Sequence, residues 1–383
     1  MHATAAAYRR RENTVYAALL CLAAIDAAGY SVIAPTLPEI AARTGAGPAA
    51  IGAVVASFPA AMIAGFVLAG RAVRRGDRSS LIAASLALSA LGCLGFIVGD
   101  TLAVVVPARA VMGLGSGGVW IAVTFATLER WPGQEYLCLS RIFAAYSVGG
   151  LVGPAIGTLE GVRAPFTGYL AFILCGLAMC SVLGRSPRRR RFASDRNALQ
   201  LPGFWFASAG IVFASLALGL VEGVLPLHLG QALTQVQIGL LYVAVSLIAF
   251  AAAVLGARFN PRRILLAGVA PVVAGLAAVG ASPHVPVWLL ALAATAIGIG
   301  FANTGSLGVL ITAVPPGRIV TAMVVWSQLG IIGYLLGPLA GGALVDSAGY
   351  GPLGLLPAAV AAGLLVAAVR TGPTTAGRWT ETG

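Results

Sequence analysis

Three ionisable residues stand inside long apolar stretches of the sequence, where charged side chains are rare. Asp26 lies in the middle of the first stretch, Arg109 lies inside the fourth, and Glu222 lies near the end of the seventh. An ionised group in the middle of a bilayer is costly, so such residues usually face the interior of a helix bundle. A carboxyl group that water reaches can bind a proton in one state and a cation in another. We therefore predict Asp26, Glu222 and Arg109 as proton-coupling residues, with Asp26 as the main one.

Each of these residues also has a structural alternative. Asp26 would then hydrogen-bond to neighbouring helices, and Glu222 would reach the membrane interface with its longer side chain. Arg109 would bind backbone carbonyls or a carboxylate. It could also do this and influence proton release electrostatically, because one guanidinium can serve both roles.

Aromatic and amide side chains in the same stretches are candidate contacts for a small-molecule ligand. Aromatic rings bind flat apolar or cationic groups, and an amide inside a membrane usually faces inward. Ordinary packing is the alternative for each of them. The predicted ligand-binding residues are Tyr30, Trp120, Asn303, Trp326 and Gln328.

The composition identifies the solvent around these residues as lipid. The 383 residues are 59% hydrophobic and only 9% charged, whereas a soluble protein carries about 25% charged residues. The net charge is +12, but the arginines occur in short clusters between apolar runs, which argues against nucleic-acid binding. None of the five cysteines has zinc-ligand spacing with histidine, so we expect no metal site.

Twelve apolar stretches are long enough to cross a bilayer as helices, which requires about 20 residues each. We place them at 14–37, 49–70, 80–99, 102–126, 138–159, 165–184, 203–226, 236–257, 264–281, 287–312, 319–345 and 351–370. The predicted fold is therefore an all-α polytopic membrane protein. It divides into a six-helix bundle at 1–184, a basic linker at 185–202 and a second six-helix bundle at 203–383.

A motif that occurs twice predicts that the two bundles are pseudo-symmetric. Both copies read Gly-x-x-x-Gly-Pro-x-x-Gly, and their central glycines are separated by 337 − 153 = 184 positions. Glycines four apart share one helix face and allow another backbone to approach closely. Proline removes one helical hydrogen bond and bends the helix. The predicted helix-packing and gating residues are Gly149, Gly153, Pro154, Gly157, Gly333, Gly337, Pro338 and Gly341.

Four motifs together resemble the major facilitator superfamily. Residues 70–78 resemble its cytoplasmic signature Gly-x-x-x-Asp-Arg-x-Gly-Arg, although Arg74 occupies the acidic position, so the gating ion pair of that aspartate does not carry over unchanged. Residues 109–115 resemble the Arg-x-x-x-Gly-x-Gly signature linked with proton coupling. Residues 149–157 resemble the helix-5 signature of proton-exchanging exporters, and residues 222–227 resemble the seventh helix of vesicular amine and multidrug exporters. The resemblance adds the gating and packing residues Gly70, Arg75, Arg78 and Gly113.

The resemblance implies a secondary transporter closest to the 12-helix drug:proton antiporter branch. Such a protein would export a small amphiphilic or cationic compound by alternating access, as a monomer driven by the proton gradient without a cofactor. The alternative on the same fold is a permease for uptake or efflux of sugars or other metabolites. A non-transporting receptor remains a further alternative.

An intramembrane enzyme is the least favoured class. Gly115-Ser116-Gly117 resembles part of an intramembrane serine protease motif, but Leu114 occupies the position of its first glycine. The chain contains no lysine, so it has no phosphate-binding loop of the Gly-rich type with Lys and does not use ATP in that way. We therefore expect no enzymatic activity.

The arginines predict which way the helices cross the membrane. All 24 basic residues are arginine, and 21 of them fall on the side of the N-terminus. Arg43 and Arg163 fall on the other side, and Arg109 lies within a helix. Because cytoplasmic loops carry the excess of positive charge, both termini are predicted in the cytoplasm and the protein in the cell (inner) membrane. Reporter fusions within 185–200 and at the C-terminus should both report the cytoplasm, and a periplasmic signal from either would contradict the count of twelve helices.

Overall fold

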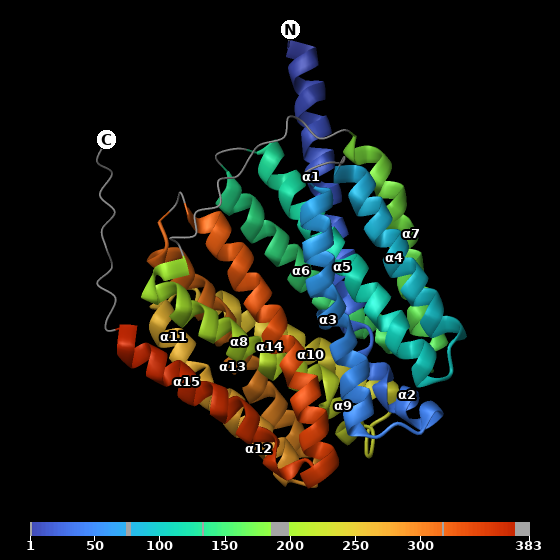
Figure 1. The fold of residues 1–383 in the computed structure, drawn as a ribbon, viewed down its shortest axis with the longest axis vertical. Helices are drawn as coiled ribbons and strands as arrows, with labels where there is room; N and C mark the ends of the chain where they lie inside the picture. Colours follow the sequence, from blue (N-terminus) through green and yellow to red (C-terminus); the bar gives the residue numbers. More distant parts are fainter. Residues whose placement is uncertain (1, 74–77, 132–133, 185–198, 316–317, 372–383) are drawn as a thin grey trace. The chain divides into compact units, whose positions relative to one another are not determined.

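The structure, a computed structural model, describes residues 2–73, 78–131, 134–184, 199–315 and 318–371. Every regular element in these ranges is a helix (Figure 1). Eleven of the helical segments are long and apolar enough to cross a membrane. The predicted all-α polytopic fold is therefore confirmed.

The helices of the first part of the chain lie where the apolar stretches predicted them. They are α1 (His2–Ser31), η1 (Ala34–Thr36), α2 (Leu37–Thr44), α3 (Pro48–Ala72), α4 (Arg78–Val98), α5 (Leu102–Arg130), α6 (Glu135–Gly157) and α7 (Arg163–Leu183). Helix α6 corresponds to the predicted stretch 138–159, ends two residues earlier at Gly157, and is not among the eleven. The predicted first stretch continues beyond α1 through a short turn into α2, which ends at Gly45 in a left-handed conformation (φ 65°).

The second part of the chain contains two breaks that hydropathy alone does not show. Its helices are α8 (Pro202–Gly223), α9 (Leu225–Leu229), α10 (Gln235–Gly256), α11 (Pro261–Ala267), α12 (Val269–Ala281), α13 (Val285–Ala313), α14 (Ile319–Ala348), η4 (Gly351–Gly354) and α15 (Leu355–Thr371). Val224 leaves the helical conformation (φ −124°) between α8 and α9. The reason is Pro226, which has no N–H to donate and whose ring crowds the carbonyl four residues earlier. Pro271 follows the break at Gly268 between α11 and α12 in the same way.

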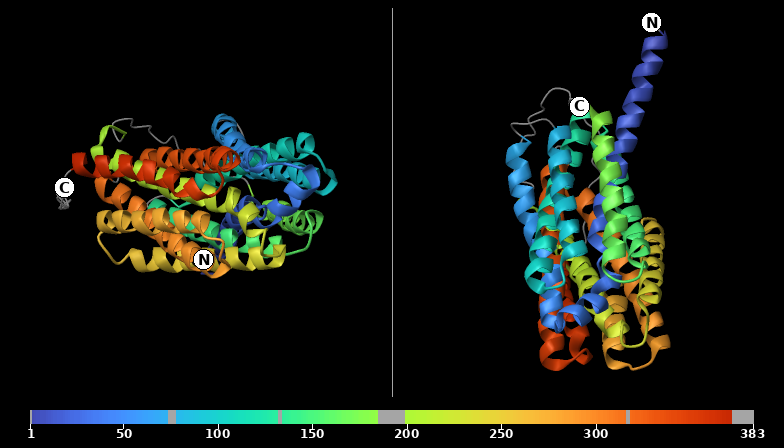
Figure 2. Two further views of the ribbon diagram at one scale, coloured as in Figure 1. Left: turned by 90° about the horizontal axis from the view of Figure 1, so that it is seen from below. Right: turned by 90° about the vertical axis from the view of Figure 1, so that its right-hand side faces the viewer.

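Contacts divide the chain into two compact units. The first consists of Met1–Arg191 with Glu222–Ala244, and the second of Phe192–Val221 with Val245–Gly383. In the first unit α5 packs along both α3 and α4, while α1 packs on α6 and α7 (Figures 1 and 2). In the second unit α13 packs on α11 and α12.

Glycines bring α6 close to α1 in the first unit. A Cβ added at Gly149 would lie 2.1 Å from the carbonyl oxygen of Ala24, and one at Gly153 would lie 2.1 Å from Ser31 Oγ. One at Gly157 would lie 2.8 Å from a ring carbon of Pro35, in the turn that follows α1. These distances are too short for any side chain, so each glycine marks a place where α6 lies in close contact with α1 or with the turn that follows it.

The second copy of the motif has the same relation to α8 in the second unit. A Cβ at Gly333 would lie 2.5 Å from the carbonyl oxygen of Val212, and one at Gly337 would lie 2.5 Å from that of Leu216. Pro154 and Pro338 lie within continuous helices, α6 and α14, and Gly341 is buried. Each Gly-Pro helix therefore packs on the first long helix of its own sequence repeat.

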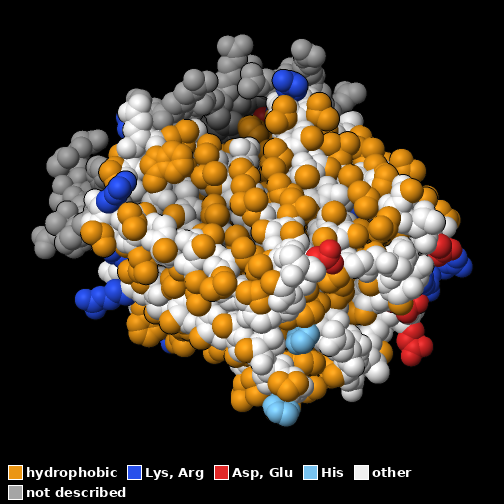
Figure 3. Space-filling view, turned by 60° about the horizontal axis from the view of Figure 1, so that its bottom comes forward, with side chains coloured by type: hydrophobic (Ala, Val, Ile, Leu, Met, Phe, Trp, Pro, Cys, Tyr) orange, Lys and Arg blue, Asp and Glu red, His pale blue; other side chains and the backbone are white. Residues whose placement is uncertain are grey.

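The outer surface of these helices is apolar. Large hydrophobic side chains such as Val98, Leu290 and Val369 are 71%, 74% and 81% exposed. Figure 3 shows one face of the molecule, on which hydrophobic side chains predominate and charged ones are few. Such a surface suits a lipid solvent, because in water so much exposed apolar area is rare.

Two neighbouring glycines of α6 give a matched test of the close packing. Gly153→Ala should lower the stability of the purified protein by about 1–3 kcal/mol, because the added methyl group has no room. Gly150→Ala should cause no loss, since nothing lies within 4 Å of a Cβ at that position. Thermal unfolding in detergent, followed by circular dichroism, measures both. Equal stability of the two variants would contradict the close approach of α1 and α6.

Candidate functional site

The Asp26 carboxylate is buried within the first unit and has a hydroxyl partner. Its side chain lies near the end of α1, in the second-last turn before Ser31, and the residue is only 2% exposed. Ser116 of α5, which is 1% exposed, donates a hydrogen bond of 2.9 Å from Oγ to Asp26 Oδ2. A hydroxyl group can both donate and accept, so Ser116 can bind the carboxylate as well as the protonated acid.

The glycines of α5 explain why Ser116 faces α1. A Cβ added at Gly113 or Gly117 would lie 2.1 or 2.4 Å from a carbonyl oxygen of α3. One at Gly115 or Gly118 would lie 2.5 or 2.1 Å from an oxygen of Ser85 in α4. Two faces of α5 are thus pressed against α3 and α4, and Ser116 points from a third face towards Asp26.

Arg109 caps the end of α1 instead of facing lipid. It is fully buried (0% exposed) and donates hydrogen bonds of 2.8 Å to the carbonyl oxygen of Gly29 and 2.7 Å to that of Tyr30. Both carbonyls belong to the last turn of α1. Carbonyls there have no N–H partner within the helix, and the helix dipole favours a cation. The guanidinium also lies 4.3 Å from the centre of the Phe58 ring. Arg109 thus donates to backbone carbonyls, which is the contact of its structural alternative, and its role in proton coupling stays a prediction.

Tyr146 connects the carboxylate region with a cluster of aromatic rings. Its hydroxyl lies near the Ser116 side chain, and it interacts electrostatically with Asp26, Arg109 and Glu222. Its ring packs edge-on against Trp120 at a centroid distance of 5.2 Å. Both rings are half-buried. Of the predicted ligand-binding residues, Trp120 thus lies beside the Asp26 region.

Glu222 is buried at the last turn of α8, immediately before the break at Val224. It is 6% exposed and belongs to the first unit. It interacts electrostatically with Tyr146 and with Tyr242 of α10. The three ionisable residues found in the sequence thus all interact electrostatically with Tyr146, which was not predicted.

A spacing in α5 could have revealed part of this arrangement. Arg109, Ser116 and Trp120 are seven and four residues apart, so they share one helix face. Tyr146 likewise lies one turn before Gly149 and Gly150 on α6. The residue types of Ser116 and Tyr146 alone did not indicate a role, because serine and tyrosine are common in membrane helices without any functional role.

The remaining predicted ligand-binding residues have different surroundings. Tyr30 is half-buried, and its ring packs edge-on against Phe58 at 5.8 Å. Trp326 is 5% exposed and donates a hydrogen bond of 2.8 Å to Ser306 Oγ in the second unit. Asn303 and Gln328 also belong to the second unit and are half-buried.

Comparison with known proteins identifies the family. The sequence profile described as Major Facilitator Superfamily matches residues 19–251 and 207–381. The chain belongs to the major facilitator superfamily. The resemblance predicted from the four motifs is thereby confirmed at the level of the superfamily.

Two solved transporter structures share the fold of this superfamily member. A bacterial homolog of the human lysosomal transporter Spinster, inward-facing and unoccupied, has a TM-score of 0.72 at 16% identity, and the match covers 94% of each chain. A mutant of the nucleoside transporter NupG has a TM-score of 0.72 at 12% identity, covering 93% of this chain and 99% of that one. Identities this low show the fold alone.

A curated relative matches a smaller part of the sequence. The uncharacterized MFS-type transporter Rv1250 of Mycobacterium tuberculosis is 31% identical over 96 residues. The match spans 25% of this chain and 17% of that protein. The chain is thus a multi-pass membrane protein with a transporter fold.

The superfamily signature after α3 ends in a buried ion pair. Arg78 is 4% exposed, and its Nη2 lies 2.6 Å from Glu129 Oε1 while its Nε lies 3.1 Å from Oε2. Arg78 also donates to the carbonyl oxygen of Val73, so it joins the end of α3, the start of α4 and the end of α5. Gly70 has open space where a Cβ would lie. Arg75 lies outside the described residues.

The cap on α1 gives a stability prediction. Arg109→Met keeps the length of the side chain but leaves the carbonyls of Gly29 and Tyr30 without their guanidinium partner. We expect a loss of about 3 kcal/mol, since each hydrogen bond to a charged group contributes about 1.5–3 kcal/mol. Arg258→Met, at an exposed position, should change stability by less than about 0.5 kcal/mol. Chemical unfolding in detergent measures both, and an Arg109→Met protein as stable as Arg258→Met would rule out the cap.

Proposed function

We propose that the protein is a secondary active transporter that exports a small amphiphilic or cationic compound in exchange for protons. The observation that carries the proposal is the buried Asp26 carboxyl group, bound by Ser116 and adjacent to Tyr146. In this proposal the protein belongs to the drug:proton antiporter branch, works by alternating access as a monomer, and uses the proton gradient without a cofactor. It is a transporter and not an enzyme.

Exchange follows if one carboxyl group serves two ligands in turn. When the site opens to the acidic side of the membrane, Asp26 takes up a proton, and the neutral acid tolerates burial better than the ion does. When the site opens to the cytoplasm, the proton leaves and the carboxylate is available for a cation. Ser116 supports both forms, because its hydroxyl can donate to the carboxylate or accept from the acid.

Aromatic rings beside this carboxyl group support an amphiphilic or cationic substrate. Trp120 packs edge-on against both Phe143 and Tyr146 at centroid distances of 5.2 Å. Aromatic faces attract organic cations and also bind flat apolar groups. In this proposal Trp120 and Tyr146 contact the apolar part of the substrate, while Asp26 and Glu222 supply negative charge.

The orientation in the membrane is part of the same proposal. The arginine distribution puts both termini in the cytoplasm of a cell whose inner membrane holds the protein. In that orientation the Arg78–Glu129 pair lies at the cytoplasmic end of the first unit. The loop between α6 and α7 then lies on the outer side.

Asp26→Asn tests the proton-linked step. The amide mimics a permanently protonated acid, so the variant should fold and insert but not accumulate substrate against a gradient when a pH difference is imposed. The measurement uses proteoliposomes loaded with a pH-sensitive dye. Uptake of each member of a panel of organic cations and neutral metabolites is followed together with the movement of protons. Asp346→Asn, at an exposed position near the end of α14, should keep full activity.

The same assay assigns a role to Glu222 and distinguishes the alternatives. Glu222→Gln should weaken transport or change the substrate range, because in the proposal this residue supplies charge without carrying the proton. If Asp26→Asn retains uphill transport, Asp26 is structural and Glu222 becomes the coupling residue. Transport of a neutral sugar or metabolite without proton movement would replace the proposal with a permease of the same fold.

A further inference from the structure

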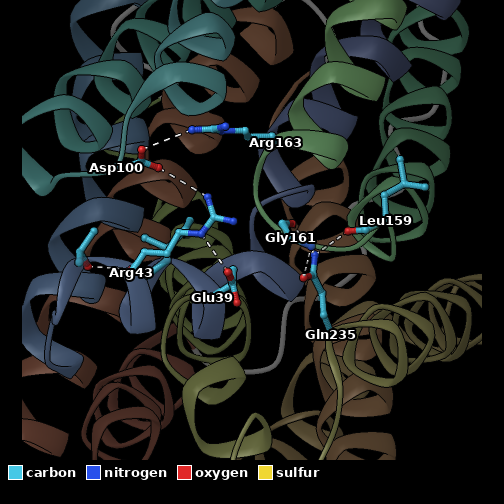
Figure 4. Close-up of polar contacts among 9 residues, drawn as sticks. Glu39, Arg43, Asp100, Leu159, Gly161, Arg163 and Gln235 are labelled. Atoms are coloured by element: carbon cyan, nitrogen blue, oxygen red, sulfur yellow. Dashed lines mark hydrogen bonds and ion pairs between the residues drawn. The ribbon is translucent and has the colours of Figure 1, made fainter.

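One amide side chain binds the whole connection between α6 and α7. Gln235 Nε2 lies 3.0 Å from the carbonyl oxygen of Gly157, 2.7 Å from that of Leu159 and 2.9 Å from that of Gly161. Gln235 Oε1 accepts a hydrogen bond of 3.0 Å from the backbone N–H of Gly161. Figure 4 shows this amide directed at Leu159 and Gly161.

These bonds satisfy groups that have no helical partner. Helix α6 ends at Gly157, so the carbonyls of Gly157 and Leu159 have no helical N–H partner. Gly161 adopts a left-handed conformation (φ 74°), which turns the chain back into α7. The carbonyl oxygens of Gly157, Leu159 and Gly161 therefore converge on the NH2 group of one side chain, and the amide supplies two N–H donors together with an acceptor oxygen.

Helix α10 presents this amide at a fixed position. Thr234 and Gln237 form a reciprocal cap: Gln237 Oε1 accepts from the N–H of Thr234 at 2.9 Å, and Thr234 Oγ1 accepts from the N–H of Gln237 at 3.3 Å. The helix consequently begins at Gln235. The cap uses groups other than the Gln235 side chain, which remains available for the α6–α7 connection.

One helical turn further along, α10 touches α6 directly. A Cβ added at Gly239 would lie 2.6 Å from Thr158 Cγ2 and 3.1 Å from the carbonyl oxygen of Pro154. Gln235 and Gly239 are four residues apart and share one face of α10. That face therefore contacts the end of α6 in two ways, by hydrogen bonds from Gln235 and by close packing at Gly239.

The opposite flank of the same connection is held by charges. Asp100 Oδ2 lies 3.4 Å from Arg163 Nη2, and Asp100 Oδ1 lies 3.6 Å from Arg43 Nη1. Arg43 in turn pairs with Glu39 at 2.9 Å (Figure 4). Because these side chains are exposed, each pair contributes little to stability. They position the connection, whereas the Gln235 bonds attach it to α10.

We propose that Gln235 is a gate latch, which holds α10 to the end of α6 in this structure and releases it when the transporter opens on that side. In sequence, α6 belongs to the first repeat and α10 to the second. A movement of one repeat against the other must therefore break these four hydrogen bonds. The inference rests on alternating access, which is part of the proposed function, but not on proton coupling, on export or on the substrate.

Hydrogen–deuterium exchange of the full-length protein in lipid nanodiscs tests the latch without any substrate or gradient. Gln235→Ala should speed exchange in peptides covering 157–163 at least tenfold, since the N–H of Gly161 loses its acceptor. Gln231→Ala is the matched control, because Gln231 is an exposed residue of the same type in the preceding turn. It should leave these rates unchanged.

A second readout separates a gate from a local cap. Thr158→Cys places a thiol under Gly239, and its labelling by a soluble maleimide should be slow in the parent. Labelling should become at least fivefold faster with Gln235→Ala and stay slow with Gln231→Ala, after subtraction of labelling of the native cysteines. Faster exchange without faster labelling would mean that Gln235 only caps the loop, and that result overturns the proposal.

The isosteric variant Gln235→Glu keeps the test informative if the alanine variant fails to fold. It retains an acceptor for the N–H of Gly161 but removes the donors to the three carbonyls, so Thr158→Cys labelling should again be faster. Unchanged exchange and labelling in a folded Gln235 variant would overturn the latch while leaving the proposed function intact. If Asp26→Asn loses proton-driven transport but keeps parental exchange and labelling rates, the result bears on the coupling step and leaves the latch in place.

Discussion

Inside a bilayer, every backbone carbonyl that lacks a helical partner has to find one within the protein. This constraint explains much of the polar structure described above. The last turns of five helices receive a hydrogen bond from a long side chain of another helix, and four of those side chains are arginines. The donor and acceptor pairs are Arg109 with Gly29 and Tyr30, Arg78 with Val73, Arg130 with Leu183, Arg262 with Ala368 and Gln235 with Gly157.

The same constraint links packing to the candidate site. Glycines let α5 lie directly on α3 and α4, and the face that remains holds Arg109, Ser116 and Trp120. Arg109 holds the end of α1, so Asp26, one turn before Tyr30, is brought opposite Ser116. A buried carboxyl group therefore has a defined partner because the backbones around it are closely packed. Packing and chemistry in this unit are determined by the same residues.

The twelve apolar stretches could be predicted from the sequence because twenty consecutive apolar residues leave a bilayer helix as the only solution. The breaks before Pro226 and after Ala267 were missed, since proline disrupts hydrogen bonds without lowering hydropathy. Asp26, Arg109 and Glu222 were visible because charge is rare in lipid. Tyr146 and Gln235 were not, because a neutral polar residue acquires its role only from partners far away in the chain. No signal in the sequence specified those partners.

Asp26 and Gln235, two polar residues of the first unit, differ in whether their side chains can carry a charge. The carboxyl group of Asp26 changes charge when it binds a proton, whereas the amide of Gln235 is neutral at every pH at which the protein is folded. An uncharged group moving across part of the membrane carries no gating current, and salt does not screen its hydrogen bonds. Electrical work in the cycle would then be done on the proton, the substrate and the ionised side chains. Breaking the Gln235 hydrogen bonds to the α6–α7 connection would itself be independent of voltage.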